Sequence, residues 1–308
     1  MLRALMLSAC LLGTAVHAED WYPSRYGADD TIGAANNLSP EKVVEAARLI
    51  RTGKAYSLAI DTGPDTPTFP PRRFSLLVMQ LGPGDGEPGG SNRVTSNDDV
   101  LITSVGIGTQ LDGLGHLGID HKYYNGLRAA DFVTNTGLKK LGIHAIPPIV
   151  SRGVLIDMAR HFGKPMLEAG QVFNRADIEA AAKAQGVRIG KGDVVLFHTG
   201  WIGLVGVDNA KFMSGEPGLG VDGARWLAGL GVVAVGADTG ALDAMPGEDR
   251  TQAVPVHAEL LAKSGVYILE NIDTRALAAD RAYEFLFVLG QPRIVGAVQA
   301  IINPIAIR

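Results

Sequence analysis

The first half of the chain consists of short apolar runs separated by turns, with one clear helical pattern. Ser39 followed by Pro40 is a typical helix start, because serine caps the first free amides and proline fits the first helical position. Apolar residues then recur at helical spacing until Gly53, which predicts a helix over residues 40–50. The apolar runs that follow predict strands at 55–60, 74–81 and 100–105.

The second half alternates between the two kinds of element. Helical spacing predicts helices over 174–184, 221–230 and 257–263. Apolar runs predict strands at 154–156, 194–198, 232–237, 266–272, 283–289 and 294–302. This alternation is typical of a mixed α/β fold, and no repeat or linker divides residues 19–308, so one domain is expected.

Residues 1–18 have the pattern of a secretory signal peptide. Arg3 supplies the positive charge, residues 4–15 are largely apolar, and residues 15–18 (AVHA) match a signal peptidase site. Cleavage after Ala18 would give a periplasmic or secreted protein that is not attached to a membrane. Two alternatives remain: a lipid anchor at Cys10 within a lipobox-like sequence, and an uncleaved signal anchor.

Composition excludes several function classes. The chain has 308 residues with 28 basic and 32 acidic side chains, and no basic run that would bind nucleic acid. Cys10 is the only cysteine, which excludes a cysteine-rich zinc site, an iron–sulfur cluster or a disulfide within the chain. Two GxGxxG matches, at 113–118 and 218–223, do not stand between a strand and a helix, so they do not predict NAD binding.

A first group of polar residues follows the predicted strand at 100–105. Gln110 and Asp112 are two positions apart, so an extended backbone places both side chains on one face. His116 comes after a glycine-rich turn and can fold back toward them. A carboxylate, an imidazole and an amide oxygen suit a divalent metal or general acid–base catalysis. The alternative is that Asp112 is an ordinary turn or cap residue.

A second group lies far downstream. His257 opens a predicted helix, and Glu270 lies within the apolar strand that follows it. A buried carboxylate is costly unless it is paired, hydrogen-bonded or bound to a metal. A salt bridge from Glu270 to Arg275 or Arg281 is the alternative to metal binding.

Together these segments resemble the metal-dependent cyclase-type hydrolase family, which includes bacterial kynurenine formamidase and isatin hydrolase. The family pattern is HxGTHxDxPxH, followed much later by a His and, about a dozen residues on, a Glu or Gln. Here the first part reads GIGTQLDGLGH at 106–116, and the later part runs from His257 to Glu270. Further similar segments, covering most of the chain, lie at 30–58, 124–126, 198–201 and 235–239.

The resemblance implies the swivelling β/β/α fold, a homodimer or homotetramer, and a metal-dependent reaction on a small-molecule substrate. Residue by residue, it implies that Asp112, His257 and Glu270 bind the metal and that His116 is the general acid/base. Gly106 and Gln110 depart from the pattern, because both positions are histidine ligands in the family.

These departures change the expected metal site. Glycine offers no side-chain ligand, and an amide oxygen is a poorer zinc ligand than imidazole. We therefore expect one divalent ion per chain, held by Asp112, His257 and Glu270 with Gln110 as an additional ligand. Because this ligand set is rich in oxygen, manganese is expected as well as zinc.

Four more residues are candidates for contact with a substrate: Trp21, His121, His198 and Trp201. Each has a structural alternative, since large aromatic residues usually pack and histidines are often surface or core residues. The Gly/Pro-rich segment 82–92 is either a mobile lid or a simple connection.

The function expected from the sequence is hydrolysis of an amide, a cyclic amide or a lactone. Metal-activated water would attack the carbonyl, with His116 as the general acid/base. One alternative is a cyclase or lyase that uses the same site. The other is an exported binding protein without catalysis. The missing histidines at Gly106 and Gln110 favour both alternatives, and the presence of His116 argues against the binding protein.

Overall fold

The computed structural model describes residues 21–80 and 88–308, and within them the fold is built on one nine-stranded sheet. Four central strands, β7, β9, β11 and β12, are parallel, and the outer strands pair antiparallel. In sheet order the strands are β1 (Ala55–Ser57), β15 (Ile305–Ile307), β13 (Glu284–Leu289), β7 (Ile149–Asp157), β9 (Val194–His198), β11 (Ala234–Ala237), β12 (Tyr267–Glu270), β4 (Gln110–Asp112) and β14 (Gln299–Ile301).

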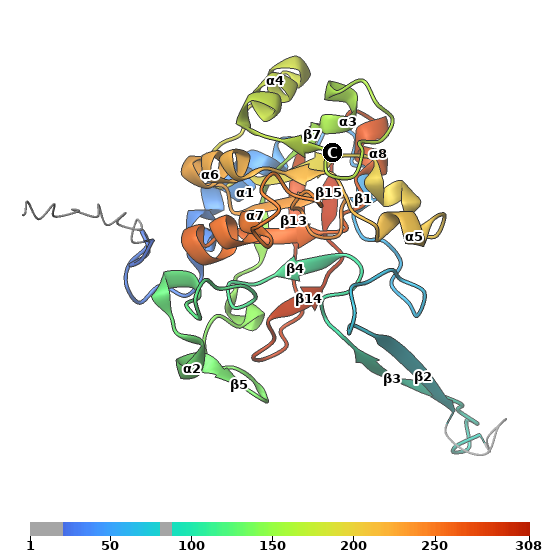
Figure 1. Cartoon of the computed structure of the whole chain (residues 1–308). Helices are drawn as coiled ribbons and strands as arrows, with labels where there is room; N and C mark the ends of the chain where they lie inside the picture. Colours follow the sequence, from blue (N-terminus) through green and yellow to red (C-terminus); the bar gives the residue numbers. More distant parts are fainter. Residues whose placement is uncertain (1–20, 81–87) are drawn as a thin grey trace, which may run out of the picture.

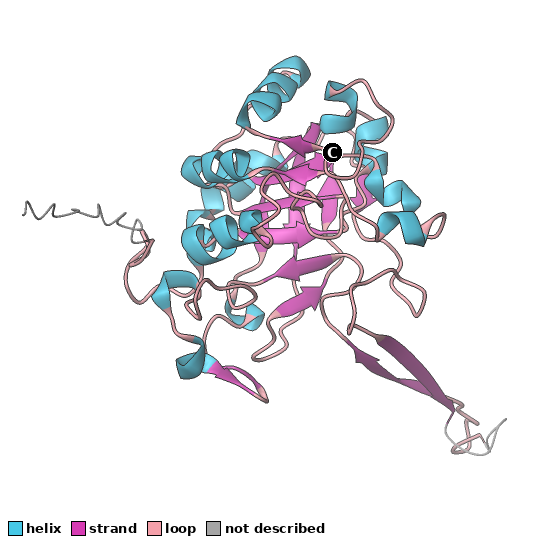
Figure 2. Ribbon diagram, viewed as in Figure 1, coloured by secondary structure: helices cyan, strands magenta, loops and turns pink. Residues whose placement is uncertain are grey.

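Helices and short pairs of strands surround this sheet (Figure 2). The α-helices are α1 (Pro40–Ala47), α2 (Ala129–Phe132), α3 (Met158–His161), α4 (Arg175–Gln185), α5 (Asn209–Phe212), α6 (Val221–Leu230), α7 (Pro255–His257) and α8 (Arg275–Ala279). Other helical turns are η1 (Gly33–Asn37), η2 (Tyr124–Gly126), η3 (Ile143–Ala145), η4 (Trp201–Leu204) and the π-helix η5 (Ala258–Ser264). The smaller pairs are β2 (Phe74–Gln80) with β3 (Asn97–Thr103), β5 (Val133–Thr134) with β6 (Gly137–Leu138), and β8 (Val172–Phe173) with β10 (Gly218–Leu219).

The centre of the sheet is apolar because it is covered on both faces. In β9 the four residues from Val194 to Phe197 are fully buried, as expected for a strand between two parallel neighbours. Helix α1 packs against β7 and β13, and α4 packs against β7 and α6. The core therefore holds the carboxyl ends of the parallel strands, and the short strand β4 beside them, in fixed positions.

The predicted mixed α/β fold in a single domain is confirmed. Strand β9 and helix α6 have the predicted bounds, and α4 differs by one residue at each end. Its start is fixed by the Asn174 amide, which donates to Asp177 Oδ2 at 2.9 Å, and its end by Gly186 at φ 73°. The helix expected over 257–263 is instead a short turn, α7, that continues as the π-helix η5.

The strands expected at 74–81 and 100–105 form, but they do not join the main sheet. They pair with each other as the hairpin β2–β3, which extends away from the body of the molecule (Figure 1). Most of its apolar side chains are exposed; Leu77 is 60% and Ile102 57% accessible. Periodicity alone predicts strands but not their partners, because pairing depends on contacts distant in sequence.

Two expectations lie wholly or mainly outside the described residues. These are the signal peptide at 1–18 and the greater part of the proposed lid, 82–87. Residues 88–92, the remainder of that segment, belong to the turn region at the far end of the hairpin. None of the helices in the described ranges has the length and apolar character needed to cross a bilayer.

Candidate metal centre

Strand β4 and its two neighbours, β12 and β14, place four polar side chains on one face of the sheet. Gln110 pairs directly with Glu270 of β12, and Asp112 pairs directly with Gln299 of β14. Residues opposite each other, and residues two apart on one strand, share a face, so all four side chains converge. Gln110 Nε2 lies 2.6 Å from Glu270 Oε2 and 3.2 Å from Asp112 Oδ1. The predicted pair of Gln110 and Asp112 therefore meets the predicted Glu270.

His257 completes this cluster from the turn α7. Its Nε2 lies 3.1 Å from Glu270 Oε1 and 3.4 Å from Asp112 Oδ2. Its other ring nitrogen, Nδ1, lies 2.7 Å from Asp243 Oδ2. The other oxygen of Asp243, Oδ1, accepts the Val256 amide at 2.8 Å. A carboxylate on the far nitrogen of a ligand histidine fixes the ring and raises its basicity. Asp243 therefore aims His257 Nε2 at the two carboxylates.

His116 approaches the same point from the solvent side. Its Nε2 lies 3.8 Å from Asp112 Oδ2, and its ring centre is 6.1 Å from that of His257. One possible ligand atom each from Asp112, His116 and His257 lie within 4.8 Å of one another. The His116 side chain keeps 24% of its surface exposed, whereas those of Asp112 and His257 are almost fully buried. Of the three, His116 has the side chain that is most exposed to solvent.

The charges in this cluster are strongly coupled. Burial opposes ionisation of Asp112, but the two imidazoles of His257 and His116 beside it outweigh the effect of burial and lower the pKa of Asp112. Burial also opposes protonation of His257, yet its contacts with Asp112, Asp243 and Glu270 raise its pKa well above the ordinary value. Burial and the Asp112 charge raise the pKa of Glu270 to about 8. Without a metal, protons on His257 and Glu270 therefore reduce the repulsion between the carboxylates of the cluster.

His116 shows the opposite behaviour to His257. Burial lowers the pKa of His116, the Asp112 carboxylate opposes this, and the positive charges of His257 and Arg72 lower it further. The net shift is downward from 6.5, so the imidazole is neutral at pH 7. A neutral imidazole can accept a proton, as a general base must.

The donor set fits a divalent ion. Asp112 Oδ2 and Gln110 Oε1 are buried, and neither has a hydrogen-bond partner among the residues that the structure describes. Unpartnered buried oxygens are costly, and a cation would satisfy both. Two carboxylates balance the two charges of such an ion, and an imidazole with oxygen ligands suits zinc and manganese alike. Neither salt bridge considered for Glu270 forms: Arg275 pairs with Asp273, and Arg281 lines a separate pocket.

The space beside Gly106 is filled by Gln299. A Cβ atom at Gly106 would lie 2.7 Å from Gln299 Oε1, closer than real side chains approach. The amide of Gln299 donates to Asp112 Oδ1 at 2.6 Å. One oxygen of Asp112 is thus occupied by hydrogen bonds, and only Oδ2 faces His116 and His257.

The structure does not bring the four candidate substrate contacts to this cluster. Trp21 packs edge-on against Tyr22, and His121 is exposed in a turn. His198, at the end of β9, contacts Thr274 Oγ1 at 2.7 Å and lines a different surface pocket. Trp201 is buried against Phe212 at the end of helix α5, and the Phe212 carbonyl accepts the Trp201 indole N–H at 3.3 Å.

A narrow cleft borders the cluster at Gln110. Gly106, Phe69, Arg72 and Phe212 also line it. Its volume is about 10 Å³, room for about one water molecule, so a substrate must displace side chains to enter. Gly240 also lines it, and a Cβ atom there would lie 3.2 Å from the buried Glu216.

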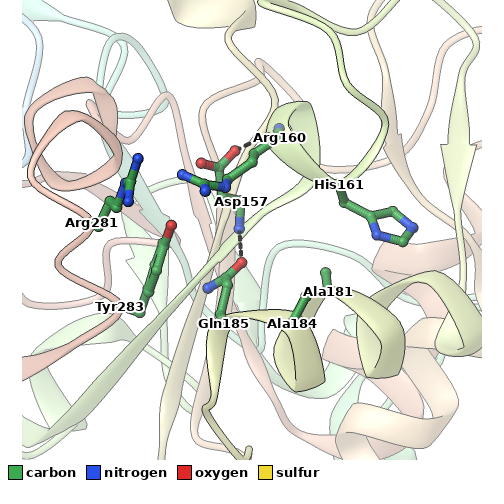
Figure 3. A pocket seen from close by; sticks show the side chains of 8 residues that line it. All are labelled: Asp157, Arg160, His161, Ala181, Ala184, Gln185, Arg281 and Tyr283. Carbon is green, nitrogen blue, oxygen red and sulfur yellow. Dashed lines mark hydrogen bonds between the residues drawn. The ribbon is translucent and has the colours of Figure 1, made fainter.

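A larger cavity, of about 340 Å³, lies between β7 and α4 and is shown in Figure 3. Arg160, His161, Arg281 and Tyr283 line it, but none of the metal-cluster residues does. Size therefore does not identify the site in this protein. The cluster of buried carboxylates and histidines does, because two buried oxygens without hydrogen-bond partners, Gln110 Oε1 and Asp112 Oδ2, converge there.

Several site residues are not apparent from the sequence. Asp243 stands in an irregular segment with no motif spacing to His257. Arg72 and Phe69 come from the segment before β2, which has no regular structure. Of these residues, only Gln299 stands out in the sequence, because it is a polar residue inside the apolar strand predicted at 294–302. Its role depends on the register with Asp112, which only the folded sheet shows.

The likeness to known proteins agrees with this geometry. A family model described as putative cyclase matches residues 56–244. A crystal structure described as a novel cyclase is 35% identical, covers 92% of this chain and 98% of its own, and superimposes with a TM-score of 0.84. A comparison with curated protein sequences gave no match.

Isatin hydrolases share the fold at lower identity. Isatin hydrolase A from Ralstonia solanacearum is 21% identical, with 88% of this chain and 98% of that chain covered and a TM-score of 0.63. Isatin hydrolase A from Labrenzia aggregata, bound to benzyl benzoate, is 19% identical, with 87% and 98% covered and a TM-score of 0.61. With the family model matching more than half of its length and a 35% identical relative along nearly all of it, the chain belongs to the cyclase family.

Proposed function

We propose that this protein is a metal-dependent hydrolase that cleaves an amide, a cyclic amide or a lactone. The observation that carries the proposal is the convergence of Asp112, His257 and Glu270 with an unpartnered carboxylate oxygen, beside the neutral and partly exposed His116. An ion held by those three residues would polarise the substrate carbonyl and lower the pKa of an adjacent water molecule.

The chain's own residues would move the proton. His116 accepts a proton from the attacking water as the water oxygen bonds to the carbonyl carbon. It then returns that proton to the leaving nitrogen or oxygen when the C–N or C–O bond breaks, so the imidazole ends neutral as it began. Asp243 keeps the His257 ring oriented throughout, through the 2.7 Å contact at Nδ1.

We further propose that the site holds one ion of zinc or manganese. Gln299 is bonded to Asp112 Oδ1 and stands against Gly106, which supports one ligand position on Asp112 rather than two. Gln110 is an additional ligand in this proposal, through the buried Oε1 that has no partner within the described ranges.

Metal analysis followed by a substrate panel tests the function. Protein loaded separately with Zn²⁺ and Mn²⁺ is assayed on an N-formyl arylamine, a cyclic imide and a lactone, with a chelated sample as the control. We expect one bound ion per chain and metal-dependent hydrolysis of at least one substrate class. Bound metal without turnover of any class would favour the cyclase, lyase or non-catalytic alternatives, and a protein that binds no metal would contradict the proposal.

We also propose a homodimer joined through the hairpin β2–β3. An isolated two-stranded hairpin is marginally stable in water, and exposed apolar surface of this kind is typical of interfaces. The exposed side chains stand on both faces of the hairpin: Leu76, Leu77, Val78, Leu101 and Ile102.

We propose, in addition, that the protein is exported. This proposal rests on the sequence of residues 1–18, and mass measurement of the mature N-terminus in a native host tests it.

A further inference from the structure

We propose that Arg72 is the substrate-specificity residue of this site and that it binds a carboxylate on a compact ring-bearing substrate. Arg72 lines the cleft together with Gln110, a residue of the metal cluster. Across residues 21–80 and 88–308, the Arg72 backbone amide donates to the Phe69 carbonyl at 3.1 Å, and its guanidinium forms no hydrogen bond and no ion pair. The inference rests on the proposed function for its meaning in catalysis, but the binding claim can be tested separately.

The charge balance of the cleft favours an anion. Arg72 is the one charged residue among the described residues that line the cleft. The other lining residues are apolar, glycine or uncharged polar, so no carboxylate of the lining neutralises the guanidinium.

The walls of the cleft suit a flat apolar group. Phe69 and Phe212 line it. A Cβ atom at Gly240 would lie 3.8 Å from the Phe69 ring and 3.7 Å from the Phe212 ring, so glycine at this position leaves the space beside both rings free. Aromatic walls favour a ring, and a planar guanidinium can bind a carboxylate through two parallel hydrogen bonds. Together these features select a carboxylate attached to a small ring over a neutral or cationic compound.

Benzoate and its neutral isostere benzamide provide the direct test. Binding of each to metal-loaded protein is measured by calorimetry for the wild type, for Arg72→Gln and for Arg73→Gln. We expect the wild type to prefer benzoate, Arg72→Gln to weaken benzoate binding about tenfold or more, and benzamide binding to stay within about twofold. Arg73→Gln is the matched control, because Arg73 is the exposed neighbour and does not line the cleft.

Two results would overturn the inference. One is a wild type that binds benzoate no better than benzamide; the other is an Arg72→Gln protein that binds benzoate as tightly as the wild type. If Arg72→Gln does not fold, Arg72→Lys replaces it, and benzoate binding must fall because a lysine cannot form the paired hydrogen bonds. Loss of hydrolysis on every substrate, with benzoate binding still dependent on Arg72, would reject the proposed function but keep this inference.

Discussion

Gln299 Nε2 donates to Asp112 Oδ1 at 2.6 Å, across the directly opposed pair of residues on β14 and β4. The same side chain fills the space that any Cβ atom at Gly106 would need. Asp112 is therefore held by a partner that leaves only its Oδ2 to face the two histidines.

Removing this partner should weaken metal binding. In Gln299→Ala, Asp112 loses the hydrogen bond that orients it, and residues that orient metal ligands typically contribute tenfold to hundredfold in affinity. We expect about a tenfold rise in the dissociation constant for Zn²⁺, measured by competition with a chromogenic chelator. Gln252→Ala, at an exposed position, is the control. Equal affinities in the two variants would show that Gln299 does not position Asp112.

Replacing His116 should separate catalysis from metal binding. In His116→Ala the proton acceptor is lost while Asp112, His257 and Glu270 remain, so we expect turnover to fall by about a hundredfold or more with the metal content unchanged. Metal is measured by elemental analysis and turnover on the best substrate of the panel.

The control for this experiment is His161→Ala, which changes a histidine outside the cluster. A His116→Ala protein that loses its metal would instead make His116 a ligand, which its position within 4.8 Å of the other two ligand atoms allows.

Metal affinity should rise with pH. In the metal-free protein His257 has a raised pKa, and Glu270 has a pKa of about 8, so both carry protons at neutral pH. An ion that binds these groups must displace the protons, and binding is weaker wherever more protons have to leave. We expect the apparent affinity to increase from about pH 6 to about pH 8.

Proton release gives an independent measurement of this coupling. Calorimetry in two buffers with different ionisation enthalpies reports the protons displaced per ion bound. An affinity that does not change over this pH range, with no net proton release, would contradict the charge arrangement derived for the cluster.

Charged residues on the hairpin should dissociate the proposed dimer. Leu77 and Ile102 lie on the same face of β2–β3, as diagonal neighbours, and are 60% and 57% exposed. The double variant Leu77→Lys, Ile102→Lys should run as a monomer in light scattering with an unchanged circular dichroism spectrum, because charge at an apolar interface is strongly unfavourable. Val207→Lys, at another exposed valine, should remain dimeric. A monomeric wild type would reject the proposal.

The sequence by itself determined the elements that depend on local pattern. Strand β9 and helix α6 have the predicted bounds because continuous apolar runs, helical spacing and terminal glycines act over a few residues. The sequence also indicated the chemistry of Asp112, His116, His257 and Glu270, because burying carboxylates and histidines costs free energy unless they have hydrogen-bond, charge or metal partners.

Only the tertiary structure decided how these residues meet. Gln299 takes part because β14 pairs with β4, which brings it to Asp112, 187 positions away in the sequence. Asp243 takes part because its irregular segment lies beside the turn α7, where it contacts His257. The same reason explains why residues 74–80 and 97–103 leave the main sheet, and why His198 and Trp201 lie outside the cleft. Local spacing sets which side chains share a face, whereas the pairing of distant strands sets which faces form the site.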